Sequence, residues 1–208
     1  MGAGMSRIRA KNQEKIITVA SRLFAEKGYA ATKTAEIARV AEIPKPNMYY
    51  YFSTKDNLYR AVLESVTEPL LAASKPIEEL DDPQEALTQY IQTKLRISRD
   101  YPAASKVFAN EVMAGAPYLP QDISDALLAQ SKMIVSKFEQ WIDQGRMSPL
   151  PAKHLMFMLW ASTQTYADFN WQICQVSGKP QLDEEDFVQA AEFLTGLVLK
   201  GCGVYGKE

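Results

Sequence analysis

The 208-residue sequence has few of the residues that most enzymes and metal proteins depend on. It contains two cysteines, Cys174 and Cys202, and one histidine, His154. Two separated cysteines form neither a zinc site nor a disulfide framework, so we interpret them as buried thiols and expect no metal. His154 begins a predicted helix and is interpreted as a terminal polar residue rather than a base. Since no nucleophile, phosphate or metal motif can be assigned, the sequence favours a protein that is not an enzyme and has no cofactor.

Long apolar runs are also missing. No run reaches the roughly 18 to 20 residues that a membrane-spanning helix needs, and the first residues lack the apolar stretch of a secretory signal. We therefore expect a cytoplasmic protein without membrane contact. With 47% hydrophobic and 23% charged residues, the chain has the composition of a globular protein that can bury a sizeable core in one or two domains.

Charge is divided unevenly along the chain. The net charge is -2, but residues 1–60 hold 11 Lys and Arg against 5 Asp and Glu, a net of +6, and residues 61–208 hold 12 against 20, a net of -8. A basic segment of this size can neutralise several DNA phosphates, while an acidic remainder stays off the duplex. On charge alone, a solvated basic surface is the alternative.

Apolar residues recur with helical spacing, and no stretch shows strand alternation between hairpin turns, so the sequence predicts an all-α protein. Near the N-terminus we predict a helix over about 12–27 that ends at Gly28. A short second helix follows Thr32, which can cap it, and further helices cover 45–51 and about 55–71. Three basic residues precede the first helix, namely Arg7, Arg9 and Lys11.

Proline and glycine residues separate the longer helices predicted beyond residue 80. Asp82 can cap a helix that starts with Pro83 and ends near Tyr101. The others are predicted over about 103–114, 121–144, 152–176 and 184–200. Four of these helices are long enough to form a bundle.

Two short helices joined by a three-residue turn, packed on a preceding amphipathic helix, are the geometry that brings a recognition helix into a major groove. In the helix over 45–51, Met48 and the following Phe52 supply apolar anchors. The residues left on or near the outer side are Lys45, Pro46, Asn47 and Tyr50. Lysine can donate to guanine, asparagine can pair with adenine, and tyrosine hydroxyls and Lys55 suit phosphate oxygens. A three-helix packing motif without DNA contact is the alternative.

The N-terminal quarter of the chain resembles the DNA-binding domain of the TetR family. The residues that carry the resemblance are Phe24, Gly28, Thr32, Ile37, Ala38, Ala41, Ile43, Tyr49, Phe52, Lys55 and Leu58. It implies a helix-turn-helix DNA-binding domain over 1–54 and a ligand-binding and dimerisation domain over 55–208. It further implies a homodimer that holds two half-sites of a pseudo-palindromic operator, usually as a repressor that a small-molecule effector releases.

The resemblance also implies roles for individual positions. Thr32 and Lys33 open the second helix against phosphate, Lys45, Pro46, Asn47 and Tyr50 meet bases, and Tyr49 and Lys55 hold the DNA backbone. The sequence departs from the family in the turn, where Glu42 replaces the usual glycine and Pro44 an often-used capping serine. Glu42 must then adopt any positive φ that the turn requires, whereas Pro44 loses only a side-chain cap.

One predicted helix face is suited to a planar ligand. Its residues recur at three- and four-residue spacing and are Trp160, Thr163, Gln164, Ala167 and Trp171. Aromatic rings with a few hydrogen-bonding groups in an apolar pocket would hold a planar polar molecule. A core or dimer-interface stripe is the alternative.

Residues 90–117 and 154–169 resemble the YcdC-like regulators of pyrimidine utilisation within the TetR family, whose ligand is uracil or thymine. The similarity implies a pocket near Trp160 and Gln164. Candidates from neighbouring helices are Lys94, Ser98, Phe108 and Glu111. For Lys94 and Glu111 a surface or interhelical ion pair is the alternative. The chain departs from this group in the recognition helix and at Thr165, so a different small hydrophobic or aromatic ligand remains the alternative.

The last two long helices carry apolar residues that suit a dimer interface. They are Leu155, Met158, Leu159, Phe187, Phe193, Leu194 and Leu197. Paired across a two-fold axis, the two helices would form a four-helix interface with a second copy. Burial of these residues within one chain is the alternative.

Overall fold

A computed structural model describes the backbone of residues 2–204 and the side chains of residues 7–204. All regular structure in that range is helical, which confirms the predicted all-α class. The chain forms two compact units: unit 1 comprises the residues up to 67 together with 103–120, and unit 2 comprises 68–102 and the residues from 121 onward. Within the described range, no helix is both long and apolar enough to cross a membrane.

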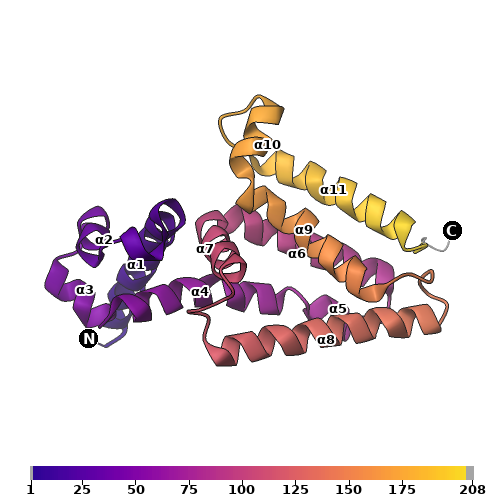
Figure 1. Ribbon diagram of the computed structural model, residues 1–208, viewed down its shortest axis with the longest axis horizontal. Coiled ribbons are helices and arrows are strands. Elements are labelled where there is room, and N and C mark those ends of the chain that lie inside the picture. The colour runs from indigo at the N-terminus through magenta and orange to yellow at the C-terminus, as the bar shows by residue number, and fades with distance from the viewer. Residues whose placement is uncertain (1, 205–208) are drawn as a thin grey trace. The chain divides into compact units, whose positions relative to one another are not determined.

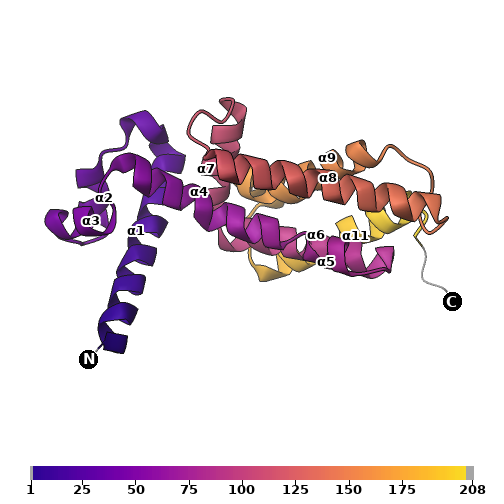
Figure 2. The same ribbon diagram turned by 90° about the horizontal axis from the view of Figure 1, so that it is seen from below.

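Unit 1 contains α1 (Gly2–Ala31), α2 (Thr34–Val40), α3 (Lys45–Tyr51), most of α4 (Lys55–Ala72) and nearly all of α7 (Pro102–Met113). The predicted bounds of α3 are confirmed, those of α4 differ by one residue at its end, and those of α7 differ by one residue at each end. Helix α1 starts well before residue 12, where it was expected, and Figure 2 shows its first turns continuing past α3. Gly28 interrupts α1 with a φ of 76°.

The core of unit 1 forms where the apolar faces of α1 to α4 meet. Ile16 and Ala20 of α1, Ile37 of α2 and Met48 of α3 are buried in one cluster. The predicted stripe on α4, formed by Leu58, Val62 and Val66, has no exposed surface. Burial of these side chains is the main force that holds a seven-residue helix such as α3, since so short a helix is not stable alone.

Thr32 does not cap α2 as predicted. The residue at the N-cap is Lys33, with an extended backbone and no side-chain cap. The Thr32 hydroxyl instead donates to the carbonyls of Leu23 (3.2 Å) and Gly28 (2.8 Å). Thr32 therefore satisfies carbonyls that the kink at Gly28 leaves at the end of the main part of α1.

The turn between α2 and α3 has the backbone form that normally favours glycine. Glu42 has a φ of 54°, so it takes the strained conformation that its position predicted. The Ile43 N–H donates to the Ala38 carbonyl (3.0 Å) and the Glu42 N–H to that of Arg39 (3.1 Å), which is the pattern of a Schellman C-cap. Pro44 is the N-cap of α3 without a side-chain cap, as expected.

Unit 2 contains α5 (Lys75–Glu79), α6 (Pro83–Asp100), α8 (Gln121–Asp143), α9 (Ala152–Asp168), α10 (Asn170–Ser177) and α11 (Glu184–Gly201). Helix α6 packs against α5, α9 and α11, and these helices can be followed in Figure 1 and Figure 2. Asp82 caps α6 by accepting from the Gln84 N–H, as predicted. Helix α5 was not predicted.

The single helix expected over 152–176 is a wrong prediction. Helix α9 ends at Asp168, Phe169 leaves the helical conformation with φ -106° and ψ 25°, and α10 starts at Asn170. No proline or glycine marks this break, and the apolar periodicity of the sequence continues through it. The sequence therefore predicted one helix where the structure has two.

The apolar residues proposed for a dimer interface divide into two groups. Leu155, Leu159, Phe187 and Leu194 are buried within unit 2, as the alternative interpretation expected. Met158, Phe193 and Leu197 remain 39%, 66% and 54% exposed. The outer faces of α9 and α11 therefore keep large apolar side chains in contact with solvent.

Candidate functional site

Helix α3 turns its polar residues outward. Met48 and Phe52 are 2% and 8% exposed, so both predicted anchors lie in the core of unit 1. Lys45, Pro46 and Asn47 are exposed, and Tyr50 is 68% exposed. A helix held by apolar anchors thus carries a cation, an amide and a phenol on its outer side, and these groups can donate to base edges and phosphates.

Three more of the predicted DNA contacts are Tyr49, on α3 itself, and Thr32 and Lys33, directly before α2. Tyr49 is 43% exposed, and its hydroxyl is 3.4 Å from that of Thr34 at the start of α2. Lys33, directly before α2, is exposed. Thr32 is 1% exposed and its hydroxyl is used by backbone carbonyls, so the side-chain phosphate contact expected for it does not fit this structure.

Lys55 is held by the end of α1. Its ammonium is 4.3 Å from the centroid of the Tyr29 ring and 3.4 Å from the Ala30 carbonyl oxygen. The Tyr29 hydroxyl in turn donates to the Asp56 carboxylate. Burial, together with this hydrogen bond, raises the pKa of Tyr29 to about 12. Lys55 is therefore a partly exposed cation whose ammonium group is held by Tyr29 and Ala30.

Two of the predicted ligand residues belong to α6 and lie inside unit 2. Lys94 and Ser98 are 6% and 4% exposed. The Ser98 hydroxyl donates to the Thr163 carbonyl of α9 (2.9 Å), and the Thr163 hydroxyl donates to the Leu159 carbonyl (2.7 Å). Ser98 and Thr163 thus join α6 to α9. Lys94 differs from both because it brings a charge into this region.

Burial is the main influence on Lys94. It lowers the pKa of Lys94 to about 8, although the Asp168 carboxylate acts in the opposite direction. An ammonium taken out of water loses hydration that a single carboxylate does not replace. Lys94 is therefore not a surface ion-pair residue. The carboxylate that acts on it, Asp168, belongs to α9, so the interhelical form of the alternative interpretation stays a prediction.

Trp160 and Gln164 lie on α9 and are both partly buried. Trp160 forms a side-chain hydrogen bond with Tyr90 of α6, and burial raises the pKa of that tyrosine to about 12. Trp171 does not continue this face, since it lies on α10 and is 74% exposed. The break at Phe169 interrupts the helical spacing from which Trp171 was predicted, so we correct that assignment.

Phe108 and Glu111 lie on α7 and belong to unit 1. Phe108 packs against the core cluster of that unit. Glu111 is 3% exposed and accepts from the Tyr59 hydroxyl (2.9 Å) and from the backbone N–H of Tyr118. The sequence did not predict this link, because its partners are 52 and seven residues away along the chain.

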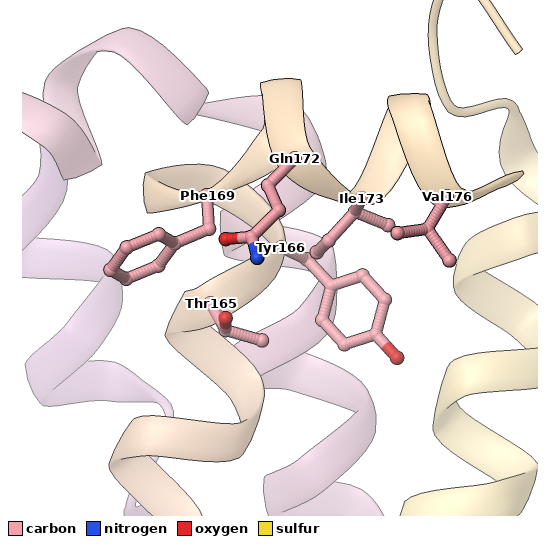
Figure 3. Close-up of a pocket in the computed structure, with 6 residues that line it drawn as sticks. All are labelled: Thr165, Tyr166, Phe169, Gln172, Ile173 and Val176. Carbon is pink, nitrogen blue, oxygen red and sulfur yellow. The ribbon is translucent and has the colours of Figure 1, made fainter. Parts of the chain in front are cut away.

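An open hollow of about 550 Å³ lies where α9 meets α10, as Figure 3 shows. Its lining residues are Thr165, Tyr166, Phe169, Gln172, Ile173 and Val176. None of the predicted ligand residues lines it. Since ligand sites combine enclosure with a few fixed polar groups, the buried groups on α6 and α9 are the stronger candidates.

The cysteines are both buried, as expected. Burial raises the pKa of the Cys202 thiol to about 11, which disfavours its reactive thiolate form. His154 is exposed near the start of α9, as expected. Among the residues that the structure describes, no group of three His, Cys, Asp or Glu side chains could hold a metal ion.

Two family models match the chain. Residues 16–62 match bacterial regulatory proteins of the tetR family, and residues 63–205 match the C-terminal region of YcdC-like proteins. The HTH-type transcriptional regulator RutR of Escherichia coli K12 is 37% identical over 196 residues, which are 94% of this chain and 92% of RutR.

Solved structures of regulators share the fold. The ketosteroid transcriptional regulator KstR2 of Mycobacterium tuberculosis has a TM-score of 0.75 at 20% identity, covering 94% of this chain and 95% of its own. AibR in complex with isovaleryl coenzyme A and operator DNA has a TM-score of 0.66 at 16% identity, covering 89% and 97%. Identities this low support the fold alone. The family models and the similarity to RutR go further: the chain belongs to the TetR family of bacterial regulatory proteins, with a YcdC-like C-terminal region, and is a ligand-responsive transcriptional regulator.

Proposed function

We propose that this regulator is a homodimeric repressor that reads a pseudo-palindromic operator through α3 and is released by a pyrimidine such as uracil or thymine. One observation carries the DNA-binding part of the proposal. Helix α3 buries Met48 and Phe52 and leaves Lys45, Pro46 and Asn47 exposed. Exposed donors on an apolar-anchored helix that follows a turn are what readout of a major groove requires.

The contacts would divide between bases and phosphates. Asn47 can pair with adenine through both atoms of its amide, and Lys45 can donate to guanine acceptors. Tyr50 supplies a further hydroxyl at the same surface. Tyr49 on this helix, Lys33 before α2 and Lys55 at the start of α4 would bind phosphates, which fix the position of the protein without reading sequence.

The pyrimidine part is supported by similarity to RutR over most of the chain and by the chemistry between α6 and α9. A pyrimidine base is planar and has carbonyl acceptors. Lys94 offers a buried donor, and Trp160 and Gln164 offer an aromatic ring and an amide that are partly buried. An acceptor beside the ammonium would replace part of the hydration that burial removes.

Dimerisation is supported by the apolar residues that unit 2 leaves exposed. Met158 on α9 and Phe193 and Leu197 on α11 keep much of their surface in solvent. Two copies paired through these helices would cover them and space two α3 helices for two half-sites. Sedimentation of a Phe193→Asp variant should then show a monomer, whereas an unchanged mass would contradict this interface.

DNA binding is tested by footprinting on the upstream region of the protein's own gene, followed by anisotropy titrations with the protected site and with random duplex. We expect Tyr49→Ala and Lys55→Ala to weaken binding to both duplexes alike, and Asn47→Ala to change the preferred base at its position. Loss of discrimination in the first two variants would show that the roles are assigned wrongly. No binding of the wild type to either duplex in low salt would exclude the function.

Ligand response is tested by adding uracil or thymine to the bound operator. A coupling of about 1 to 3 kcal/mol would weaken operator binding roughly 5- to 150-fold. Lys94→Met should lose the response while keeping operator affinity, and Lys132→Met, on exposed α8 surface, is the matched control. If neither pyrimidine changes the affinity of the wild type, the pyrimidine class is wrong, and other small aromatic molecules become the class to test.

A further inference from the structure

The side of α1 that packs in the core of unit 1 extends into earlier turns of the helix, which lie outside that core. Arg9, Asn12 and Ile16 are spaced three and four residues apart, so they share one side of the helix. Ile16 is fully buried in unit 1, Asn12 is partly buried, and Arg9 is exposed. The same face thus changes from apolar to polar in the turns that Figure 2 shows continuing past α3.

Two contacts join this polar end of α1 to the tyrosines of α3. The Asn12 side-chain amide donates to the Tyr51 hydroxyl at 3.0 Å. The Arg9 guanidinium lies over the ring of Tyr50, 5.3 Å from its centroid. The rings of Tyr50 and Tyr51 are themselves edge to face, 5.5 Å apart. Arg9 is therefore held beside the outer surface of α3 rather than projecting freely from α1.

The way Arg9 is held leaves its donors usable. A guanidinium has five N–H donors, and a cation–π contact needs no hydrogen-bond acceptor for them, so the contact with Tyr50 at 5.3 Å leaves donors of Arg9 for another partner. Tyr50 is 68% exposed, so the pair lies at the solvent surface. An exposed guanidinium with N–H donors to spare is well suited to a phosphate oxygen.

We propose that Arg9 binds a backbone phosphate of the operator beside the groove that α3 enters. This extends the DNA interface beyond residues 16–62, which match the family model of the DNA-binding domain. The inference rests on the proposed function of α3. In it, Tyr50 has a second role, because its ring fixes the guanidinium against the protein before DNA binds.

The neighbouring basic residues provide the contrast. At about 100° per residue, Arg7 and Lys11 lie roughly 160° around the helix from Arg9, and both are exposed. They carry the same charge on nearly the opposite side of α1. If Arg9 acts by position, only its removal affects the contact, whereas a general effect of basic charge would be shared by all three residues.

The test compares Arg9→Ala with Lys11→Ala, measuring affinity for the footprinted upstream fragment and for random duplex over a range of salt concentrations. For Arg9→Ala we expect a loss of roughly tenfold in low salt and a salt slope shallower by about 0.9, the value of one released counterion. Lys11→Ala should match the wild type in both measurements. Arg9→Lys, which keeps the charge, should recover most of the slope.

Three outcomes overturn the inference. The first is an Arg9→Ala variant that matches the wild type, and the second is an equal change of slope in Lys11→Ala. The third is a weakened Arg9→Ala variant with an unchanged slope, since Arg9 would then only position Tyr50. If the wild type binds DNA and Asn47→Ala changes base preference in the same experiments, the proposed function survives each of these outcomes. If the wild type does not bind, both proposals fail together.

Discussion

Each unit of the molecule buries a charge opposite in sign to its own net charge. The residues of unit 1 hold 12 Lys and Arg against 7 Asp and Glu, a net of +5, yet unit 1 buries the carboxylate of Glu111. The residues of unit 2 hold 11 against 18, a net of -7, yet unit 2 buries the ammonium of Lys94. The net charge of a unit affects its solubility and its attraction to charged partners. A single buried charge has to be explained instead by the groups that contact it.

The local contacts of these two residues differ in kind. Glu111 accepts hydrogen bonds from Tyr59 and from the backbone of Tyr118, so its carboxylate oxygens have donors within its own unit. Lys94 keeps a lowered pKa of about 8 even with Asp168 acting on it. Its charged form is therefore less well solvated in the folded chain than in water. We infer that Glu111 is a structural link, and that Lys94 is the residue that gains from a bound acceptor.

The largest expected effect concerns Lys94 and pH. Its pKa of about 8 in the folded chain lies below the unfolded value near 10.4, so between these values the unfolded chain binds more protons. Stability due to Lys94 is thus gained as pH rises through this window and lost as pH falls towards 8. The free energy of unfolding of the wild type, relative to Lys94→Met, should rise by about 3 kcal/mol across the window, as measured by urea denaturation.

Comparing the wild type with Lys94→Met cancels the effect of other groups that titrate in the same pH range. Burial raises the pKa of Cys202 to about 11 and that of Tyr90 to about 12. Both groups lower stability at high pH in the wild type and in Lys94→Met alike, and Lys132→Met should follow the wild type. Parallel pH curves for the wild type and Lys94→Met would show that Lys94 is solvated like a surface lysine, and the contrast with Glu111 would disappear.

The next effect concerns the link between Glu111 and Tyr59. Burial and the hydrogen bond to Glu111 hold the pKa of Tyr59 well above its usual range, as expected for a hydroxyl that donates to a carboxylate. Glu111→Gln removes the charge, and we expect a loss of about 2 kcal/mol in the free energy of unfolding. In a double-mutant cycle with Tyr59→Phe, the coupling should be about 1 to 2 kcal/mol.

A second cycle supplies the control for this link. Tyr50 is an exposed tyrosine of the same unit, so Glu111→Gln combined with Tyr50→Phe should show no coupling. If both cycles gave the same value, Glu111 would act through the general stability of unit 1 rather than through Tyr59. The inference that its charge is satisfied by specific donors would then be wrong.

The sequence predicted most of the helices and the orientation of α3, because these depend on local signals. Met48 and Phe52 were assigned to the core from spacing alone, and the positive φ of Glu42 followed from the family's glycine at its position. The contacts of Arg9 with Tyr50 were not predicted. They require α1 to continue in helical form ahead of residue 12, where no apolar face gives a periodic signal.

The candidate ligand site was less predictable for a different reason. Helical spacing from Trp160 to Trp171 assumed an unbroken helix, and the break at Phe169 has no proline or glycine to reveal it. Glu111 was grouped with Lys94 because both lie in one similar stretch of sequence, yet packing assigns α7 to unit 1. The predicted domain boundary after residue 54 stays a prediction. Which polar residues become buried, and beside what, depends on long-range packing that local patterns do not contain.

The smallest expected effect is at Glu42, an exposed residue whose backbone matters more than its side chain. Its φ of 54° is costly for a residue with a Cβ atom, and its ion pair with Lys15 (3.0 Å) joins side chains that are 82% and 46% exposed, so that pair contributes little. Glu42→Gly should raise the free energy of unfolding by about 0.5 to 1 kcal/mol, after the entropy cost of glycine, as measured by urea denaturation. Glu42→Ala keeps the strain and loses only the ion pair, so it should show no gain. A destabilised glycine variant would mean that the Lys15 contact, rather than the Schellman turn, holds α3 at its angle.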